Sequence, residues 1–106
     1  MVEPASAVAT TDKVFAALAH PSRRQIMLTL HFRGGEMTAG EIAERFGCSW
    51  PTTSRHLNVL LQAGLVEVVK RGRERIYRVD ADRLQTVVGA WMNWFSENGE
   101  GGSKRT

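Results

Sequence analysis

The segment 38–79 constrains the fold of this chain most strongly, because two helix signals and a hairpin signal follow one another within it. Thr38 and Glu41 have the spacing of a capping box, in which the hydroxyl and the carboxylate each accept a hydrogen bond from a backbone amide that lacks a helical partner. Gly47 suits the left-handed conformation that ends many helices. A short helix is therefore predicted between them, with Ile42 and Phe46 on its apolar side.

A second helix is predicted directly after this turn. Ser49 can cap it, and Pro51 fits its first turn, where a backbone N–H would have no helical partner. Its buried stripe is predicted to consist of Leu57, Leu60 and Leu61. Gly64 ends this helix, and Leu65 can fold back onto its last turn.

A hairpin with a basic tip is predicted next. Residues 65–70 and 74–79 are rich in β-branched and aromatic side chains, and Arg71-Gly72-Arg73 lies between them. Between Arg55 and Arg78 the chain has six positive and two negative side chains, an excess larger than the +3 of the whole sequence. An isolated charge run is usually a solvated face, but this run follows a polar helix. The combination is typical of nucleic-acid binding.

Two further helices are predicted before this segment. Thr11 or Asp12 can cap the first of them, since both side chains accept hydrogen bonds from backbone amides. Pro21 fits the first turn of the second helix. Gly34 and Gly35 end that helix, so that it leads directly into the segment described above.

One domain is predicted over residues 11–95, because a chain of 106 residues favours a single core. Residues 1–10 are small and weakly patterned, and we expect a flexible N-terminus. Residues 96–106 are glycine-rich and charged, and we expect a disordered tail. The single cysteine, the absence of a signal-peptide pattern and the absence of a membrane-length apolar stretch favour a cytoplasmic protein.

With these elements in place, the sequence resembles the ArsR/SmtB family of winged helix-turn-helix repressors over residues 12–95. The phrases that carry the resemblance are ALAHPSRRQIMLTL, the pattern from Glu41-Ile42-Ala43 through Ser54-Arg55-His56-Leu57, and LLQAGLVEVVKRGRERIYRVD. The resemblance implies a mostly α fold with a small β-hairpin, of about five helices and a two-stranded wing. It also implies a homodimer that binds operator DNA near promoters, with members that respond to metals, to redox signals or to no known ligand.

The second helix of the motif is the predicted DNA-reading element, because its N-terminal half is polar. Arg55 has a planar fork that matches O6 and N7 of guanine. By the resemblance, Ser54 and His56 belong to the Ser-x-His-Leu pattern of the helix that enters the major groove, although a packed role for His56 is an equal alternative. Trp50 departs from the polar residue usual in the family, and it either contacts DNA or folds onto the scaffold. The candidate DNA-binding residues are Ser49, Trp50, Thr52, Thr53, Ser54, Arg55 and His56 in the helix and Arg71, Arg73 and Arg75 at the wing tip.

A dimer interface is predicted on the last helix, which Asp80 or Asp82 can cap. Its apolar residues recur at helical spacing, and its aromatic stripe exceeds what a chain this short can bury alone. Plain core packing is the simpler alternative for the same stripe. A two-fold axis would let two reading helices enter successive major grooves, which favours the dimer. The candidate interface residues are Val14, Phe15, Leu18, Leu84, Val87, Val88, Trp91, Met92, Trp94 and Phe95.

No cofactor and no metal are expected. By the resemblance, a metal site would need cysteines in the segment EIAERF or histidine with aspartate on the last helix, and neither is present. His20, His31 and His56 form no recognisable ligand pattern in the sequence. Cys48 fits a small buried hydrophobic position, and a redox switch would find no second cysteine in the chain.

The function predicted from the sequence is a sequence-specific DNA-binding transcriptional regulator, a dimeric repressor that binds a near-palindromic operator in double-stranded DNA. An enzyme is not expected, because Ser54 and His56 lie two positions apart on a helix and cannot act as a nucleophile and base. Two alternatives stay open. One is a winged-helix module that docks proteins, and the other is a sensor of the same fold with an unknown small-molecule or redox effector.

Overall fold

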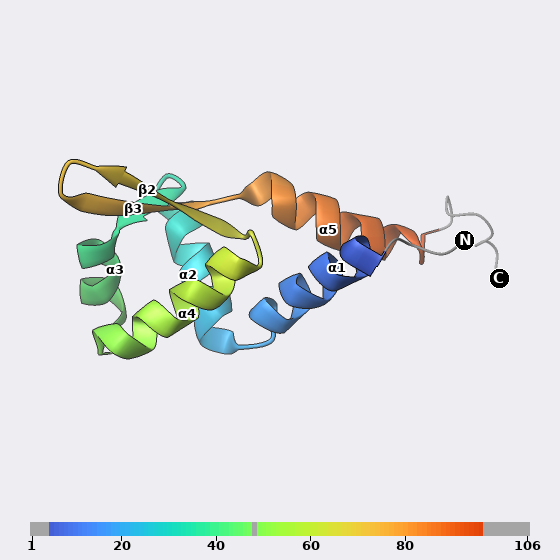
Figure 1. Ribbon diagram of the computed structural model, residues 1–106, viewed down its shortest axis with the longest axis horizontal. Coiled ribbons are helices and arrows are strands. Elements are labelled where there is room, and N and C mark those ends of the chain that lie inside the picture. Colours follow the sequence, from blue (N-terminus) through green and yellow to red (C-terminus); the bar gives the residue numbers. More distant parts are fainter. Residues whose placement is uncertain (1–4, 48, 97–106) are drawn as a thin grey trace.

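Five helices and a three-stranded sheet make up the part of the chain that the computed structural model describes, residues 5–47 and 49–96 (Figure 1). The elements in order are α1 (Ala5–Leu18), α2 (Pro21–Phe32), β1 (Glu36–Thr38), α3 (Ala39–Phe46), α4 (Trp50–Gln62), β2 (Val66–Arg71), β3 (Glu74–Val79) and α5 (Ala81–Asn93). The predicted mostly α fold with a winged helix-turn-helix arrangement is confirmed, and the predictions for Cys48 and for the tail after Ser96 lie outside the described residues.

The predicted helix ends are confirmed in the α3–α4 region. Thr38 and Glu41 form the capping box, and Gly47 ends α3 with a φ of 63°. The Ser49 side chain caps α4 by accepting a hydrogen bond from the Thr52 amide. At the other end of α4, the amides of Gly64 and Leu65 donate to carbonyls of the last turn, which is the hydrogen-bond pattern of a Schellman motif. These local contacts fix the length and direction of both helices.

The sheet has the antiparallel order β1-β3-β2. The hairpin β2–β3 was predicted with a three-residue tip, but Arg71 pairs with Glu74, so that only Gly72 and Arg73 form the loop. Gly72 has a φ of 65°, which suits the first position of a tight hairpin loop. Strand β1 was not predicted, because three residues are too few to show an alternating pattern.

The hydrophobic core lies where the helices α1–α4 meet the sheet. Leu30 of α2, Ile42 of α3, and Leu57 and Leu60 of α4 are at most 1% exposed. Other members of the core include Val14, Ala17, Ile26, Met27, Met37, Leu65, Val66 and Tyr77. The core therefore joins the two helices of the motif to the base of the wing and sets their relative orientation.

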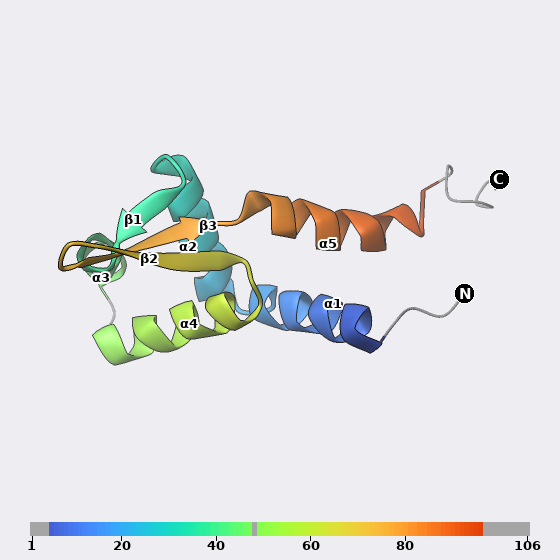
Figure 2. The same cartoon turned by 45° about the horizontal axis from the view of Figure 1, so that its top comes forward.

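The long axis of the molecule has two distinct ends (Figures 1 and 2). The hairpin tip and the N-terminus of α4 lie at one end, and α1 and α5 run side by side toward the other. The principal extents are 53 × 27 × 22 Å. Helix α1 begins at Ala5, which is earlier in the chain than the predicted caps Thr11 or Asp12. The reason is the alanine-rich composition of this stretch, which favours extension of the helix.

Candidate nucleic-acid interface

The buried face of α4 is set by Leu57 and Leu60, and it includes Thr53 one turn earlier. Thr53 is 2% exposed and belongs to the core. The prediction that Thr53 contacts DNA is therefore wrong, because a side chain enclosed by the fold cannot reach a groove. The physical signal was present in the sequence, since Thr53 lies four residues before Leu57 and thus on the same face of the helix.

The opposite face of α4 carries Arg55, Asn58 and Gln62, which are all exposed. Their spacing of three and four residues aligns them in one stripe along the helix. Arg55 was predicted to read DNA, whereas Asn58 and Gln62 were not, because the prediction covered only the polar N-terminal half of the helix. Because Leu57 and Leu60 mark the buried face of the helix, helical periodicity places Asn58 and Gln62 on the opposite, exposed face. The exposed stripe presents a guanidinium and two side-chain amides, which are the groups that recognise guanine and adenine.

The N-terminal turn of α4 is built around its cap. Ser49 Oγ accepts from the Thr52 amide at 3.4 Å and donates to Thr52 Oγ1 at 3.1 Å, so these two side chains stabilise each other and the first turn. Trp50 is 36% exposed, which leaves part of its ring accessible. Ser54 is half-buried. The Thr52 and Thr53 amides both donate to Ser49, and Pro51 has no N–H, so the hydrogen bonds of this turn are largely satisfied within the helix.

His56 is half-buried and is contacted by residues of α2 and of the turn that precedes α2. Its Nδ1 atom lies 3.3 Å from Arg23 Nη1, and its ring centroid lies 4.5 Å from that of His20. The pKa of His56 is lowered, first by burial and then by the positive charges of His20, Arg23 and Arg55. These contacts support the packed alternative for His56 over a direct contact with DNA.

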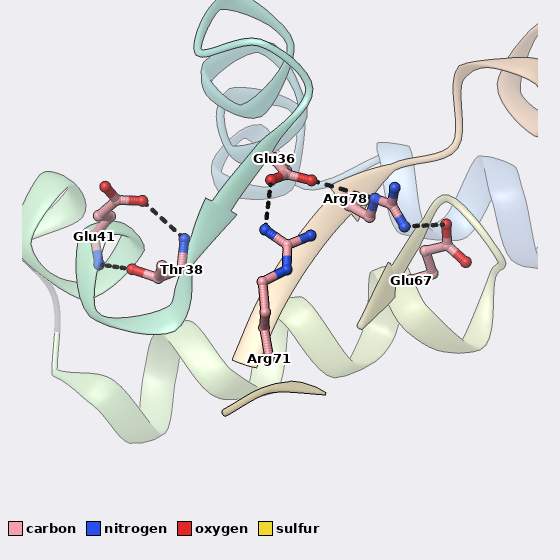
Figure 3. Close-up of polar contacts among 6 residues, drawn as sticks. All are labelled: Glu36, Thr38, Glu41, Glu67, Arg71 and Arg78. Carbon is pink, nitrogen blue, oxygen red and sulfur yellow. Dashed lines mark hydrogen bonds and ion pairs between the residues drawn. The ribbon is translucent and has the colours of Figure 1, made fainter. Parts of the chain in front are cut away.

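Four charged side chains form a series of ion pairs across one face of the sheet (Figure 3). Glu36 of β1 contacts Arg71 Nη1 at 3.4 Å through Oε2 and Arg78 Nε at 3.3 Å through Oε1. Arg78 Nη1 also lies 3.8 Å from Glu67 Oε2. These carboxylates come from the strands on either side of β3, because Glu36 and Glu67 both pair with Arg78 in register. Arg71 is therefore partly neutralised by Glu36 and oriented along the sheet.

The tip of the wing is different, because its cations have no such carboxylate partner among the described residues. Lys70 and Arg75 lie directly opposite each other in the β2–β3 register, and Arg73 occupies the loop. All three are exposed. Like charges directly opposite each other destabilise an antiparallel pair, and a nearby anion would relieve that repulsion. Lys70 was not among the predicted contacts, and only its cross-strand pairing with Arg75 identifies it.

The predicted dimer-interface residues fall into three groups by burial: one is buried, five are half-buried and four are exposed. Val14 is 0% exposed within a single chain, which corrects its assignment to an interface, because it already packs in the core. Phe15 contacts Trp91 edge to face at 5.3 Å between ring centroids, and this contact joins α1 to α5. Four residues on and just after α5 remain exposed in the single chain, namely Trp91, Met92, Trp94 and Phe95. Leu18, Leu84, Val87 and Val88 are half-buried beside the core.

The family that the sequence resembles includes metal sensors, which use clustered His, Cys, Asp or Glu side chains as ligands. Within residues 5–47 and 49–96, no three His, Cys, Asp or Glu side chains gather closely enough to hold a metal ion. His20 Nδ1 accepts a hydrogen bond from the Ser22 amide at 3.0 Å and caps α2. In the same part of the chain, no helix is long and apolar enough to cross a membrane.

Comparison with known proteins agrees with this geometry. A helix-turn-helix domain family matches residues 18–69. The chain is 39% identical to the transcriptional repressor SdpR of Bacillus subtilis over 89 residues, which is 84% of this chain and 96% of that protein. The crystal structure of an ArsR family transcriptional regulator superposes with a TM-score of 0.74 at 27% identity, and it covers 97% of this chain and 100% of its own.

A second solved structure adds information on the fold. It is the homodimeric winged helix-turn-helix DNA-binding domain of a possible ArsR-family regulator from Mycobacterium bovis, with a TM-score of 0.67 and 28% identity. The alignment covers 97% of this chain and 100% of that domain. The extent of the match to SdpR, the motif at residues 18–69 and the superposition of the whole fold agree with one another. The chain belongs to the ArsR/SmtB family of winged helix-turn-helix, DNA-binding transcriptional regulators.

Proposed function

We propose that this regulator is a dimeric repressor that reads a two-fold symmetric operator with α4 in the major groove and the wing tip on the flanking backbone. The observation that carries the proposal is the joint position of two exposed features. The polar stripe with Arg55 and Asn58 belongs to the helix whose N-terminus lies at the same end of the molecule as the wing tip (Figures 1 and 2). A duplex can therefore engage both at once.

Within α4, which we call the recognition helix, base reading falls to Arg55 and Asn58. Arg55 can donate two hydrogen bonds to O6 and N7 of guanine, and Asn58 can pair with N6 and N7 of adenine. Both are exposed and lie three residues apart, so they can reach neighbouring bases. Gln62 lies one turn further along the same stripe. Ser49 and Thr52 stabilise the first turn through their mutual hydrogen bonds.

The wing tip binds the phosphate backbone through Lys70, Arg73 and Arg75. The repulsion between Lys70 and Arg75 supports this role, because an anion placed between them would relieve it. Arg71 contributes less, since Glu36 already shares its charge. Each phosphate contact should release counterions and steepen the dependence of affinity on salt by about 0.9 in a plot of log K against log salt.

A homodimer and a repressing action are supported by the relatives. The Mycobacterium bovis domain is homodimeric, and SdpR is a repressor. In this chain, the exposed aromatic residues after the Phe15–Trp91 contact provide the apolar surface that such a dimer would bury. The proposed dimer places two recognition helices about 34 Å apart, which is one turn of the duplex.

We propose that DNA binding needs no metal. Two of the three histidines support this, because His20 caps α2 and His56 contacts Arg23. A chelator should then leave the affinity for operator DNA unchanged. A loss of binding in chelator that zinc restores would reject metal independence without rejecting DNA binding.

The test uses fluorescence anisotropy with a duplex that the wild-type protein recovers from a randomised pool and with a scrambled duplex of equal length. Arg55→Ala should weaken selective binding by about 1–3 kcal/mol and reduce the preference for the recovered duplex. Arg73→Ala should weaken both duplexes alike and flatten the salt dependence. Absence of salt-dependent binding to any duplex would instead support a protein-docking module.

A further inference from the structure

Arg23 of α2 lies between the last turn of α1 and the recognition helix. Its Nε atom donates to the Ala17 carbonyl at 2.7 Å, and its Nη2 atom donates to the Ala16 carbonyl at 3.2 Å. Its Nη1 atom lies 3.3 Å from Nδ1 of His56. One guanidinium therefore contacts the C-terminal carbonyls of α1 and a side chain in the middle of α4.

The contact with His56 depends on the protonation state of the imidazole. A guanidinium has only donors, so Nδ1 of His56 must accept, and the proton of the neutral ring must lie on Nε2. A protonated imidazole has no acceptor and would present a positive charge to Arg23. The contact between Arg23 and His56 can therefore exist only while His56 is neutral.

Every charged or titratable group that acts on His56 is basic. His20 approaches from the turn before α2, Arg23 from α2 itself, and Arg55 from the neighbouring position of α4. From α1, the nearby groups engaged by Arg23 are neutral backbone carbonyls. Burial and these positive charges lower the pKa of His56, so the fold favours the neutral ring that the contact requires.

We propose that Arg23 is a positioning residue for the recognition helix, which it ties to the end of α1 only while His56 is neutral, so that acid weakens selective DNA binding. The proposal rests on the proposed function, because it concerns the orientation of α4 on an operator. In this proposal the proton is the ligand that regulates selective binding. Since α1 packs against α5 through Phe15 and Trp91, the same tie also joins the recognition helix to the helices of the proposed dimer interface.

The direction of the pH effect follows from the lowered pKa of His56. The stabilisation by the Arg23–His56 contact is fully present above the ordinary imidazole pKa of about 6.5. It is lost as the pH falls through the lowered pKa of His56. By linkage, the pKa of His56 should be lower in the complex with operator DNA than in the complex with scrambled DNA, since selective binding favours the neutral form. Protonation in acid adds positive charge near DNA and would strengthen non-selective binding. The informative quantity is therefore the ratio of the affinity for the operator to the affinity for a scrambled duplex.

The experiment measures the affinity of the full-length wild-type protein for the recovered duplex and for the scrambled duplex from about pH 7.5 to about pH 5.5. We expect the ratio of the two affinities to fall by about fivefold or more over this range. His56→Asn keeps a side-chain acceptor near Nδ1 but does not titrate, and its affinity ratio should largely lose the pH dependence. His31→Asn, on the exposed end of α2, is the matched control and should retain the wild-type profile.

A second pair of variants tests Arg23 itself. Arg23→Lys keeps the charge but cannot maintain all three contacts, and it should reduce the affinity ratio at neutral pH and flatten its pH profile. Arg24→Lys is the matched control, because Arg24 is the next residue and donates to the Leu18 carbonyl at 2.8 Å rather than to a group on α4. Arg24→Lys should keep the wild-type ratio and profile. Thermal unfolding of each variant at both pH values identifies any variant that fails to fold.

Titration of the histidine rings by NMR in the free protein tests the contact between Arg23 and His56 without DNA. In Arg23→Met, loss of the neighbouring positive charge should raise the pKa of His56 relative to wild type. An affinity ratio that does not change with pH in the wild type, or a profile that His56→Asn leaves intact, would overturn the proposal. If no duplex is bound selectively at any pH while the NMR shift occurs as expected, the proposed function fails, and with it the DNA-linked role of Arg23.

Discussion

Helices α4 and α5 have the same length and similar numbers of apolar residues, but they are buried very differently. Helix α4 places Leu57 and Leu60 at 1% and 0% exposure, whereas α5 has no buried residue in the single chain. The aromatic side chains at the end of α5 are largely open to solvent, with Phe95 at 74%. The apolar face of α4 is therefore buried by its own chain, whereas that of α5 is not.

This difference separates the two tasks of the molecule. The recognition helix must be held rigidly by the core so that its exposed stripe meets base edges in one register. The exposed apolar surface of α5 is instead favourable only when another apolar surface covers it. In the proposed dimer, a second copy supplies that surface, and the spacing of the two recognition helices follows from it.

The largest expected effect concerns the buried side of this comparison. Leu60→Ala should lower the free energy of unfolding by about 2–5 kcal/mol, because it leaves a cavity where α4 meets the core. The matched change Leu84→Ala, at a half-buried position of α5, should cost less. Urea unfolding at one fixed protein concentration measures both. Equal losses would show that α5 is as fully packed as α4.

The next effect concerns the exposed side. Phe95→Glu should raise the dissociation constant of the dimer by about 30-fold or more, because it places a charge in the proposed interface. Phe32→Glu on α2 is the matched control, since Phe32 is 76% exposed but lies on a helix outside the proposed interface. Sedimentation equilibrium distinguishes the two variants. If Phe32→Glu dissociates the dimer and Phe95→Glu does not, the interface lies on α2 rather than on α5.

The smallest effect tests the local contacts that position the motif. Thr38→Ala removes the hydroxyl that accepts from the Glu41 amide at 3.0 Å and should destabilise the protein by about 1 kcal/mol. Thr38→Ser keeps that hydroxyl and serves as the control. Thermal unfolding monitored by circular dichroism is sensitive enough for this difference. If Thr38→Ala were as stable as Thr38→Ser, the capping box would make no net contribution.

Much of the fold could be predicted because its signals are local. The caps at Thr38, Ser49 and Asp80 and the glycines that end α3 and α4 act within one turn of their own helices. Their hydrogen bonds do not depend on distant segments, so residue type and spacing are sufficient to identify them. The hairpin was predictable for the same reason, although its loop proved shorter than expected.

The candidate site could be predicted only in part, because several of its features depend on distant residues. The contact of Glu36 with Arg71 joins positions 35 residues apart, and that of Arg23 with His56 joins positions 33 apart. Neither spacing has a signature in the sequence. Burial of Thr53 and exposure of Asn58 follow from the phase of α4, which the sequence contained.

The most direct test of the account is the symmetry of the DNA that the wild-type protein recovers from a randomised pool. If the dimer presents two recognition helices, sequencing should reveal an inverted repeat whose half-sites are centred about 10 base pairs apart. Guanine and adenine at adjacent positions in each half-site would fit Arg55 and Asn58 on one stripe. Recovery of a single, unrepeated site would contradict the proposed dimeric arrangement on DNA.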